Sequence, residues 1–165
     1  MVLNGIQLLL NYDIVPPSDA RNILRVLVIQ ANSGKPENQL KLLQIVLQLA
    51  NFLAKDSSQY LTEAAVCSLV TLSFQLCDIR NNVSVQSTAF ATARQIISLV
   101  LGGVCELSDR HYTAGSSSSG DFASASLTIS AQMIVKDVAL FVKGSPGEWC
   151  KGDYFFNLNG FSTLI

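Results

Sequence analysis

The chain has 165 residues, of which 49% are hydrophobic and only 14% are charged, against about 25% charged residues in a typical soluble domain. This balance excludes a disordered tail, which needs low hydrophobicity and high charge. Eleven Lys and Arg against twelve Asp and Glu leave a net charge of −1, which excludes a generally basic nucleic-acid binder.

Breaks rich in Pro, Gly, Ser and Asn divide residues 1–165, which we interpret as one domain, into segments of helical length. A short apolar segment precedes Pro16-Pro17, and Ser18-Asp19 then supplies the start of a longer helix. The longer helices are expected at about 18–31, 37–54, 60–77, 84–107 and 126–143. Residues 108–125, with the run Ser116 to Gly120, are expected to be a disordered Ser-rich insert.

The helix at 37–54 has polar residues at steps of 3, 4, 3 and 4, which form one narrow stripe on a helix. The stripe consists of Lys41, Gln44, Gln48, Asn51 and Lys55. Nearly all other positions are apolar, so we expect this helix to be covered on most of its circumference. Helix pairs recur every roughly 40 to 45 residues, which is the period of HEAT and armadillo repeats.

These patterns predict an all-α fold, an α-solenoid of about three HEAT/armadillo-like helix pairs. Terminal repeats need polar outer faces, and both ends of this chain are apolar. The segment from Leu3 to Leu10 resembles a helix without a mate. We therefore expect a fragment of a longer helical-repeat chain.

The residues offer little catalytic chemistry. The one histidine, His111, is expected in a solvated loop, and Cys105 is expected in a buried stretch. The four cysteines form no CxxC pair, potential metal ligands are scattered, and no phosphate-binding loop occurs. Gly102-Gly103 is interpreted as a weakened helix turn or a close packing contact. We expect no enzyme activity, cofactor or metal, and no apolar stretch long enough to span a membrane.

Two features are candidate recognition surfaces. Cations on the polar stripes could form a shallow surface for an acidic partner or anionic lipid, although an ordinary solvated face explains them equally simply. These cations are Lys41, Lys55, Arg80, Arg94, Lys136 and Lys143. The second is an aromatic cluster that is either an exposed interface or core packing against a further helix pair. It comprises Trp149, Tyr154, Phe155, Phe156 and Phe161.

Three stretches carry a family resemblance. Residues 40–47, LKLLQIVL, are followed by an Asn81-Asn82 helix containing Arg94-Gln95, and then by the Lys136-Asp137 helix with Trp149 after it. In order and spacing, residues 37–165 resemble the N-terminal dimerisation and cyclophilin-binding (DCB) domain of the Mon-two family, which the large Arf guanine-nucleotide exchange factors share. The family has further helices before the position of residue 1 here, and the helix after Lys136 ends early.

The resemblance implies a non-catalytic scaffold for membrane trafficking, on the cytosolic face of the Golgi, trans-Golgi network and endosomes. The partners it implies are an Arf-like GTPase, a Dopey-type scaffold or a second copy of the chain, with weak peripheral membrane contact at most and no nucleic acid. Two alternatives stay open. One is a regulatory domain of a large Arf exchange factor, and the other is an unrelated HEAT or armadillo adaptor.

Overall fold

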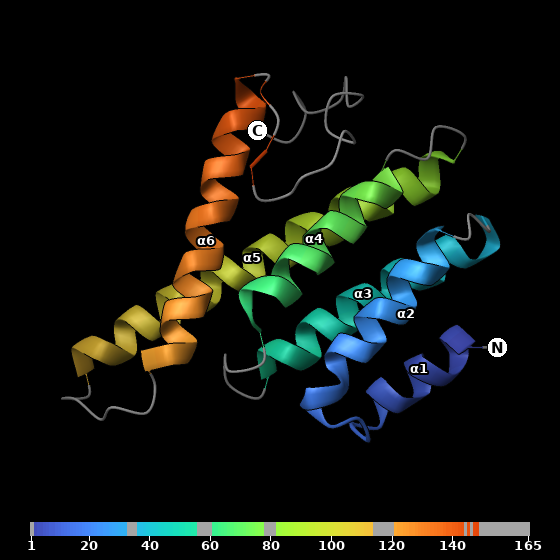
Figure 1. Cartoon of the computed structure of the whole chain (residues 1–165), viewed down its shortest axis with the longest axis horizontal. Helices are drawn as coiled ribbons and strands as arrows, with labels where there is room; N and C mark the ends of the chain where they lie inside the picture. The colour runs from blue at the N-terminus through green and yellow to red at the C-terminus, as the bar shows by residue number, and fades with distance from the viewer. Residues whose placement is uncertain are drawn as a thin grey trace.

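The computed structural model of the chain describes residues 2–32, 36–55, 61–77, 82–113, 121–143, 145, 147 and 148. Within these residues the regular structure is entirely helical and contains no strand (Figure 1). Its elements are α1 (Val2–Asn11), the 3₁₀ turn η1 (Pro17–Asp19), α2 (Ala20–Asn32), α3 (Pro36–Lys55), α4 (Glu63–Cys77), α5 (Val83–Thr113) and α6 (Asp121–Val142). The predicted all-α fold is confirmed.

The helices alternate between two layers. In one layer α1 packs on α3 and α3 packs on α5, while in the other α2 packs on α4 and α4 packs on α6. Contacts of α3 with α2 and α4, and of α5 with α4 and α6, join the layers. In Figure 1, α2 to α5 run alongside one another and α6 crosses α5 steeply. Stacking of every second helix in this way is the arrangement expected of helical repeats.

Polar side-chain contacts join helices that are one repeat apart. The Lys41 ammonium donates to the side-chain oxygen of Asn4, and Gln48 Nε2 donates to Asn11 Oδ1 at 3.2 Å. In the other layer, Gln75 Nε2 donates to Asn32 Oδ1 at 2.7 Å. Both layers therefore repeat with a separation of 37 to 43 residues along the chain, close to the predicted period.

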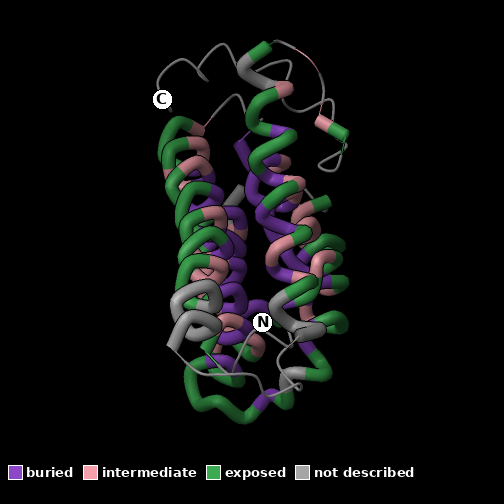
Figure 2. Tube along the Cα trace, turned by 90° about the vertical axis from the view of Figure 1, so that its left-hand side faces the viewer, coloured by how far each residue is buried: buried purple, intermediate pink, exposed green. Residues whose placement is uncertain are grey.

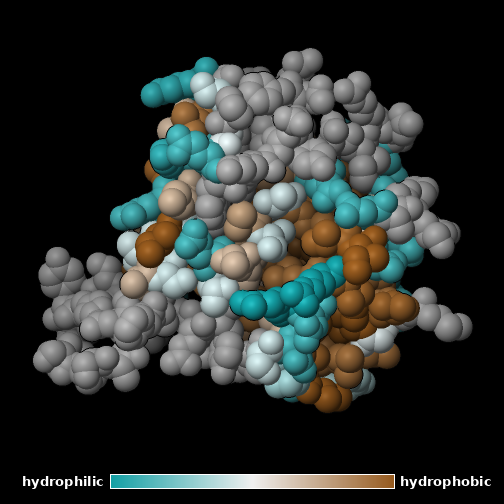
Figure 3. Space-filling model, viewed as in Figure 1, coloured by the Kyte–Doolittle hydropathy of each residue, from teal (hydrophilic) through white to brown (hydrophobic). Residues whose placement is uncertain are grey.

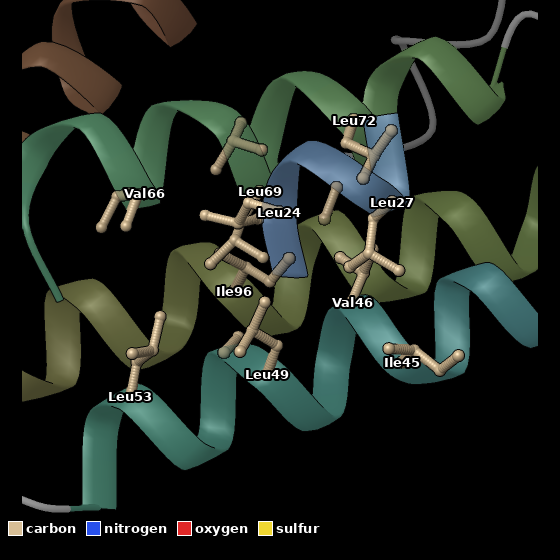
Figure 4. Close-up of a cluster of buried hydrophobic side chains, with 14 of the residues drawn as sticks. Leu24, Leu27, Ile45, Val46, Leu49, Leu53, Val66, Leu69, Leu72 and Ile96 are labelled. Atoms are coloured by element: carbon tan, nitrogen blue, oxygen red, sulfur yellow. The ribbon is translucent and has the colours of Figure 1, made fainter. Parts of the chain in front are cut away.

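The core lies between the layers, and the middle helices supply most of it (Figure 4). The largest fully buried side chains come from α2, α3, α4 and α5. They are Leu27, Leu42, Leu43, Ile45, Val46, Leu49, Leu53, Val66, Leu69, Leu72, Leu76 and Ile96. In Figure 2 the buried parts of the tube face the interior and the exposed parts face outward. Leu40, at the start of the predicted apolar face, is an exception and is 40% exposed.

The helix starts follow the sequence signals. Asn82 Oδ1 accepts a hydrogen bond from the Val85 backbone N–H at 3.2 Å, so Asn82 caps the start of α5. Thr62 Oγ1 similarly accepts from the Ala65 N–H at 3.3 Å at the start of α4. Both side chains satisfy a backbone donor that has no partner within its helix.

One sequence prediction about a segment is wrong. The predicted loop over residues 108–125 is too long, because α5 continues to Thr113 and α6 already begins at Asp121. The predicted disorder between these helices falls on residues outside the described part of the chain. The first helix, which resembled a helix without a mate, packs on α3 of its own layer and buries Leu3 and Leu10.

The two glycines late in α5 have different surroundings. A Cβ atom added to Gly103 would lie 2.8 Å from Leu127 Cδ2 of α6, whereas one added to Gly102 would meet nothing within 4 Å. Leu127 is itself buried, so Gly103 permits the close approach of α5 and α6. The predicted close packing contact is therefore confirmed for Gly103.

The prediction that no apolar stretch is long enough to span a membrane is wrong for α5. Residues Val83–Glu106 form a stretch long and apolar enough to cross a membrane by those two measures, with a mean hydropathy of 1.4 and 28% of the window buried. Here one face of α5 packs on α3 and α4, and its buried positions recur every three or four residues: Val85, Ala89, Ala93, Ile96 and Val100. Arg94, near its centre, is exposed, and an arginine at a bilayer centre costs roughly 2.5–3.5 kcal/mol or more. The observed packing is that of a helix within a protein layer.

Candidate interaction surfaces

The predicted cations of α3 are already engaged within the chain. Lys41 contacts Asn4 of α1, and Lys55 forms an ion pair with Asp13 at 2.9 Å just beyond α1. The polar stripe of α3 therefore holds α1 in place, with Gln48 contributing at its middle. The ion pair is largely exposed, so it orients the chain more than it stabilises it.

The remaining described cations lie in both layers. Arg94 is exposed on α5, in the same layer as α3, whereas Lys136 lies on α6 in the other layer and Lys143 directly follows α6. Arg80 lies outside the described residues, as does the aromatic cluster that begins at Trp149. A role for these residues in partner binding stays a prediction.

Lys136 and Asp137 hold the chain that follows α6. Lys136 Nζ pairs with Glu148 Oε2 at 2.6 Å, and this contact raises the pKa of the Lys136 ammonium. The neighbouring Asp137 is buried, and its Oδ1 accepts a hydrogen bond from the Glu148 backbone N–H at 2.8 Å. These two adjacent residues of the Lys136-Asp137 helix therefore bind one residue, Glu148, through its side chain and its backbone.

Exposed apolar side chains gather on the first two helices. More than half of the exposed large hydrophobic residues of the described chain lie between residues 2 and 29. They are Val2, Leu8, Leu9, Tyr12, Ile14, Val28 and Ile29. Figure 3 shows the resulting hydrophobic area over α1 and α2 on one face of the molecule. Contiguous exposed apolar surface of this kind typically marks a protein–protein contact.

A groove of about 750 Å³ lies beside this area, between the N-terminal parts of α2 and α4. Its α2 wall carries Arg21 and Arg25 above Leu24 and Val28, and its α4 wall is made of small residues, including Ala64, Ala65 and Ser68. None of its lining residues is acidic. This groove was not predicted from the sequence. The i, i+4 spacing of Arg21 and Arg25 was visible, but the pairing of α2 with α4 was needed to place it.

The cysteines and the histidine are placed differently from the prediction in two cases. Cys105 is exposed, not buried, because it points away from the packed face of α5. His111 lies within α5 and not in a loop. Cys77 is buried at the end of α4, where desolvation raises the pKa of its thiol to about 12. Among the described residues, no three His, Cys, Asp or Glu side chains come together in a way that could hold a metal.

Comparison with known protein families assigns the chain to one family. Residues 1–106 match the DCB family, described as a Mon2/Sec7/BIG1-like dimerisation and cyclophilin-binding domain. The chain belongs to the DCB family. No curated protein and no solved structure matched it.

The family match covers a different part of the chain from the resemblance predicted over residues 37–165. The match includes α1 and α2, which the resemblance over residues 37–165 had left out. It ends at residue 106, so the Lys136-Asp137 helix lies beyond it. The hydrophobic area on α1 and α2 and the α2–α4 groove both lie within the matched region. These two surfaces are therefore features of the DCB domain itself.

Proposed function

We propose that this DCB domain is a non-catalytic protein-interaction and self-association module of a membrane-trafficking scaffold. The proposed place of action is the cytosolic face of the Golgi, the trans-Golgi network and endosomes. Recruitment occurs through protein partners, such as an Arf-like GTPase, a Dopey-type scaffold or a second copy of the chain. The observation that supports this proposal most strongly is the exposed apolar surface of α1 and α2 inside the region that matches a dimerisation and binding family.

The physical argument is that exposed apolar area favours association. Leu8 and Leu9 are 55% and 44% exposed on α1, and Tyr12 and Ile14 follow them with exposures of 71% and 64%. Burying apolar area contributes about 25 cal/mol per Å², so a partner that covers these side chains gains a favourable term. Electrostatic attraction contributes less, because two of the predicted surface cations are already paired with α1 and the segment after it.

Sedimentation of purified chain tests self-association. The parent is expected to dimerise in a concentration-dependent manner, and Leu8→Glu with Leu9→Glu is expected to shift it to monomer. Val135→Glu is the matched control, because Val135 is 57% exposed on α6, away from α1. A parent that stays monomeric at all concentrations, or equal effects of the two sets of changes, would contradict self-association through α1.

Localisation needs a separate experiment with the full-length chain in cells. A fluorescent fusion is expected to overlap Golgi and endosomal markers, and to become diffuse when Leu8 and Leu9 are replaced by Glu. A fusion that is diffuse from the start, or that marks another compartment, would contradict the proposed location.

A second candidate is supported by the breadth of the family, whose description includes Sec7-like and BIG1-like proteins. The module would then be a regulatory and dimerisation domain of a large Arf exchange factor. The Arg94-Gln95 and Lys136-Asp137 helices favour the Mon-two type over this alternative. An exchange domain further along the full-length chain would decide for the exchange factor.

A further inference from the structure

The groove between α2 and α4 has the form of a binding site for a helix. The two helices are parallel and joined near their C-terminal ends by the hydrogen bond between Asn32 and Gln75. Towards their N-terminal ends they leave a groove of about 750 Å³. Its α2 wall extends from Arg21 to Ile29, about 12 Å at 1.5 Å per helical residue, or roughly two turns.

The charged side chains that line the groove are all positive. Arg21 and Arg25 lie one turn apart on α2, both are exposed, and the ion pairs of the described residues do not include them. The first turns of both α2 and α4 also line the groove, and helix N-termini carry partial positive charge. An occupant with two carboxylates one helical turn apart would match this pair of arginines.

Apolar residues of both helices line the groove. Leu24 of α2 and Ala65 of α4 are buried, whereas Val28 of α2 and Ala64 of α4 are exposed. The Ser68 hydroxyl donates to the Ala64 carbonyl at 2.8 Å, so it needs no partner from outside its own helix. Because the α4 side chains are small, another backbone can approach closely. Apolar side chains of an occupant would reach Leu24 and Val28.

The shape of the site distinguishes a helix from a membrane. A bilayer surface is flat on this scale and would touch the arginines without filling the concave space between the helices. An amphipathic helix can place its apolar stripe on the apolar lining and its acidic edge against Arg21 and Arg25.

We propose that the α2–α4 groove of this domain binds an amphipathic helix of a partner protein that carries acidic residues along one edge of its apolar stripe. The inference rests on the proposed function as an interaction module and specifies the chemistry of one partner. The groove is separate from the α1 residues used above to test self-association, so the two can fail independently.

The test is a selection from a phage-displayed library of helical peptides, about five turns long, whose variable positions hold Leu, Glu, Gln or Lys. The full chain is immobilised as the parent, as Arg21→Glu with Arg25→Glu, and as Ala64→Trp, which fills the groove without changing its charge. Arg94→Glu is the control, because Arg94 is an exposed arginine on α5. Thermal melting of each variant confirms that the fold is kept.

The parent and Arg94→Glu are expected to enrich peptides that combine a Leu stripe with Glu at i and i+4. The double arginine variant should enrich Lys in place of Glu. A selected acidic peptide should bind the double variant and Ala64→Trp at least roughly tenfold more weakly than the parent, because like charges or a blocked groove then oppose docking. Its affinity for the parent should fall with added salt.

Three results would overturn the proposal. The first is a parent that enriches no acidic peptides, and the second is equal enrichment by the parent and the double variant. The third is binding that Ala64→Trp leaves unchanged. Flotation with phosphatidylcholine–phosphatidylserine vesicles tests the other source of negative charge. Binding that is lost in the double variant, without peptide selection by the parent, would assign the arginines to a membrane. Self-association that persists in the double variant shows that the proposed function stands whatever the outcome at the groove.

Discussion

The first helix and the fourth helix have similar apolar composition but different surroundings. In α4, at the middle of its layer between α2 and α6, nine residues of fifteen are buried, including Val66, Leu69 and Leu72. In α1, at the end of the other layer, only Leu3 and Leu10 of ten residues are buried, while Leu8 and Leu9 are exposed. A helix inside a stack is covered on several sides, whereas a helix at its end is covered on one. Apolar residues of similar composition are therefore buried in the middle of the described stack and exposed on its first helix.

The largest expected effect is at the centre of the stack. Leu43 of α3 is 0% exposed, so Leu43→Ala leaves a cavity and is expected to cost about 2–5 kcal/mol of unfolding free energy. Leu40→Ala, on the same helix but 40% exposed, should cost well under half of that. Urea unfolding followed by circular dichroism measures both. Equal costs would remove the distinction between the covered and uncovered faces of α3.

The next effect separates two neighbouring glycines on α5. Gly102→Ala is expected to stabilise the domain by about 0.5–1 kcal/mol, since alanine favours the helix and the added methyl group meets no atom. Gly103→Ala should be less stable than Gly102→Ala by about 1–3 kcal/mol, because its methyl group would overlap buried Leu127. The melting temperatures of the two variants, measured under the same conditions, test this difference. A Gly103→Ala variant as stable as Gly102→Ala would mean that the Leu127 side chain can move aside at no cost.

A third effect concerns the buried thiol at the end of α4. The Cys77 thiol has a pKa of about 12 in the folded chain against 9.0 without burial, so the unfolded chain loses this proton first. The contribution of this thiol to stability is therefore expected to be nearly constant below about pH 8 and to fall by roughly 1 kcal/mol between pH 9 and pH 10. Urea unfolding at each pH, repeated with Cys77→Ala, isolates the contribution of this residue. A pH dependence that is unchanged in Cys77→Ala would show that other groups cause it.

The smallest effect is expected at the polar stripe of α3. Lys41 and Lys55 contact Asn4 and Asp13, so neutralising them together with Arg94 should change binding to anionic vesicles little at physiological salt. Each surface cation contributes about 1 kcal/mol to such binding, and salt screens it. Vesicle flotation of the parent and of Lys41→Gln, Lys55→Gln and Arg94→Gln combined is the measurement. If the parent binds anionic vesicles tightly and the combined variant does not, the stripe is a lipid-binding site.

Much of the helix pattern could be predicted from particular residues, and the error in it has a local reason. The helix predicted at 37–54 is α3 at Pro36–Lys55, because its stripe of polar residues recurs with helical spacing. The predicted loop at 108–125 was too long because the Ser-rich run at 116–120 indicates a break but not where the helices on either side of it end. No Pro or Gly occurs between Gly103 and Gly115, so nothing in that stretch stops a helix. Asp121, an acidic residue at the start of α6, was an available signal for its first turn.

Most of the helices, the repeat period and the membership of a helical-repeat family could be predicted from the sequence, because these depend on residue spacing along one chain. Which side chains remain exposed depends on the packing of the helices. Lys41 and Lys55 looked free in the sequence but contact α1 and the segment after it, and Cys105 looked buried but is exposed. Arg21 and Arg25 became part of a site only when α4 was placed beside α2. Local periodicity indicates which face of a helix is apolar, but burial depends on whether another helix covers that face.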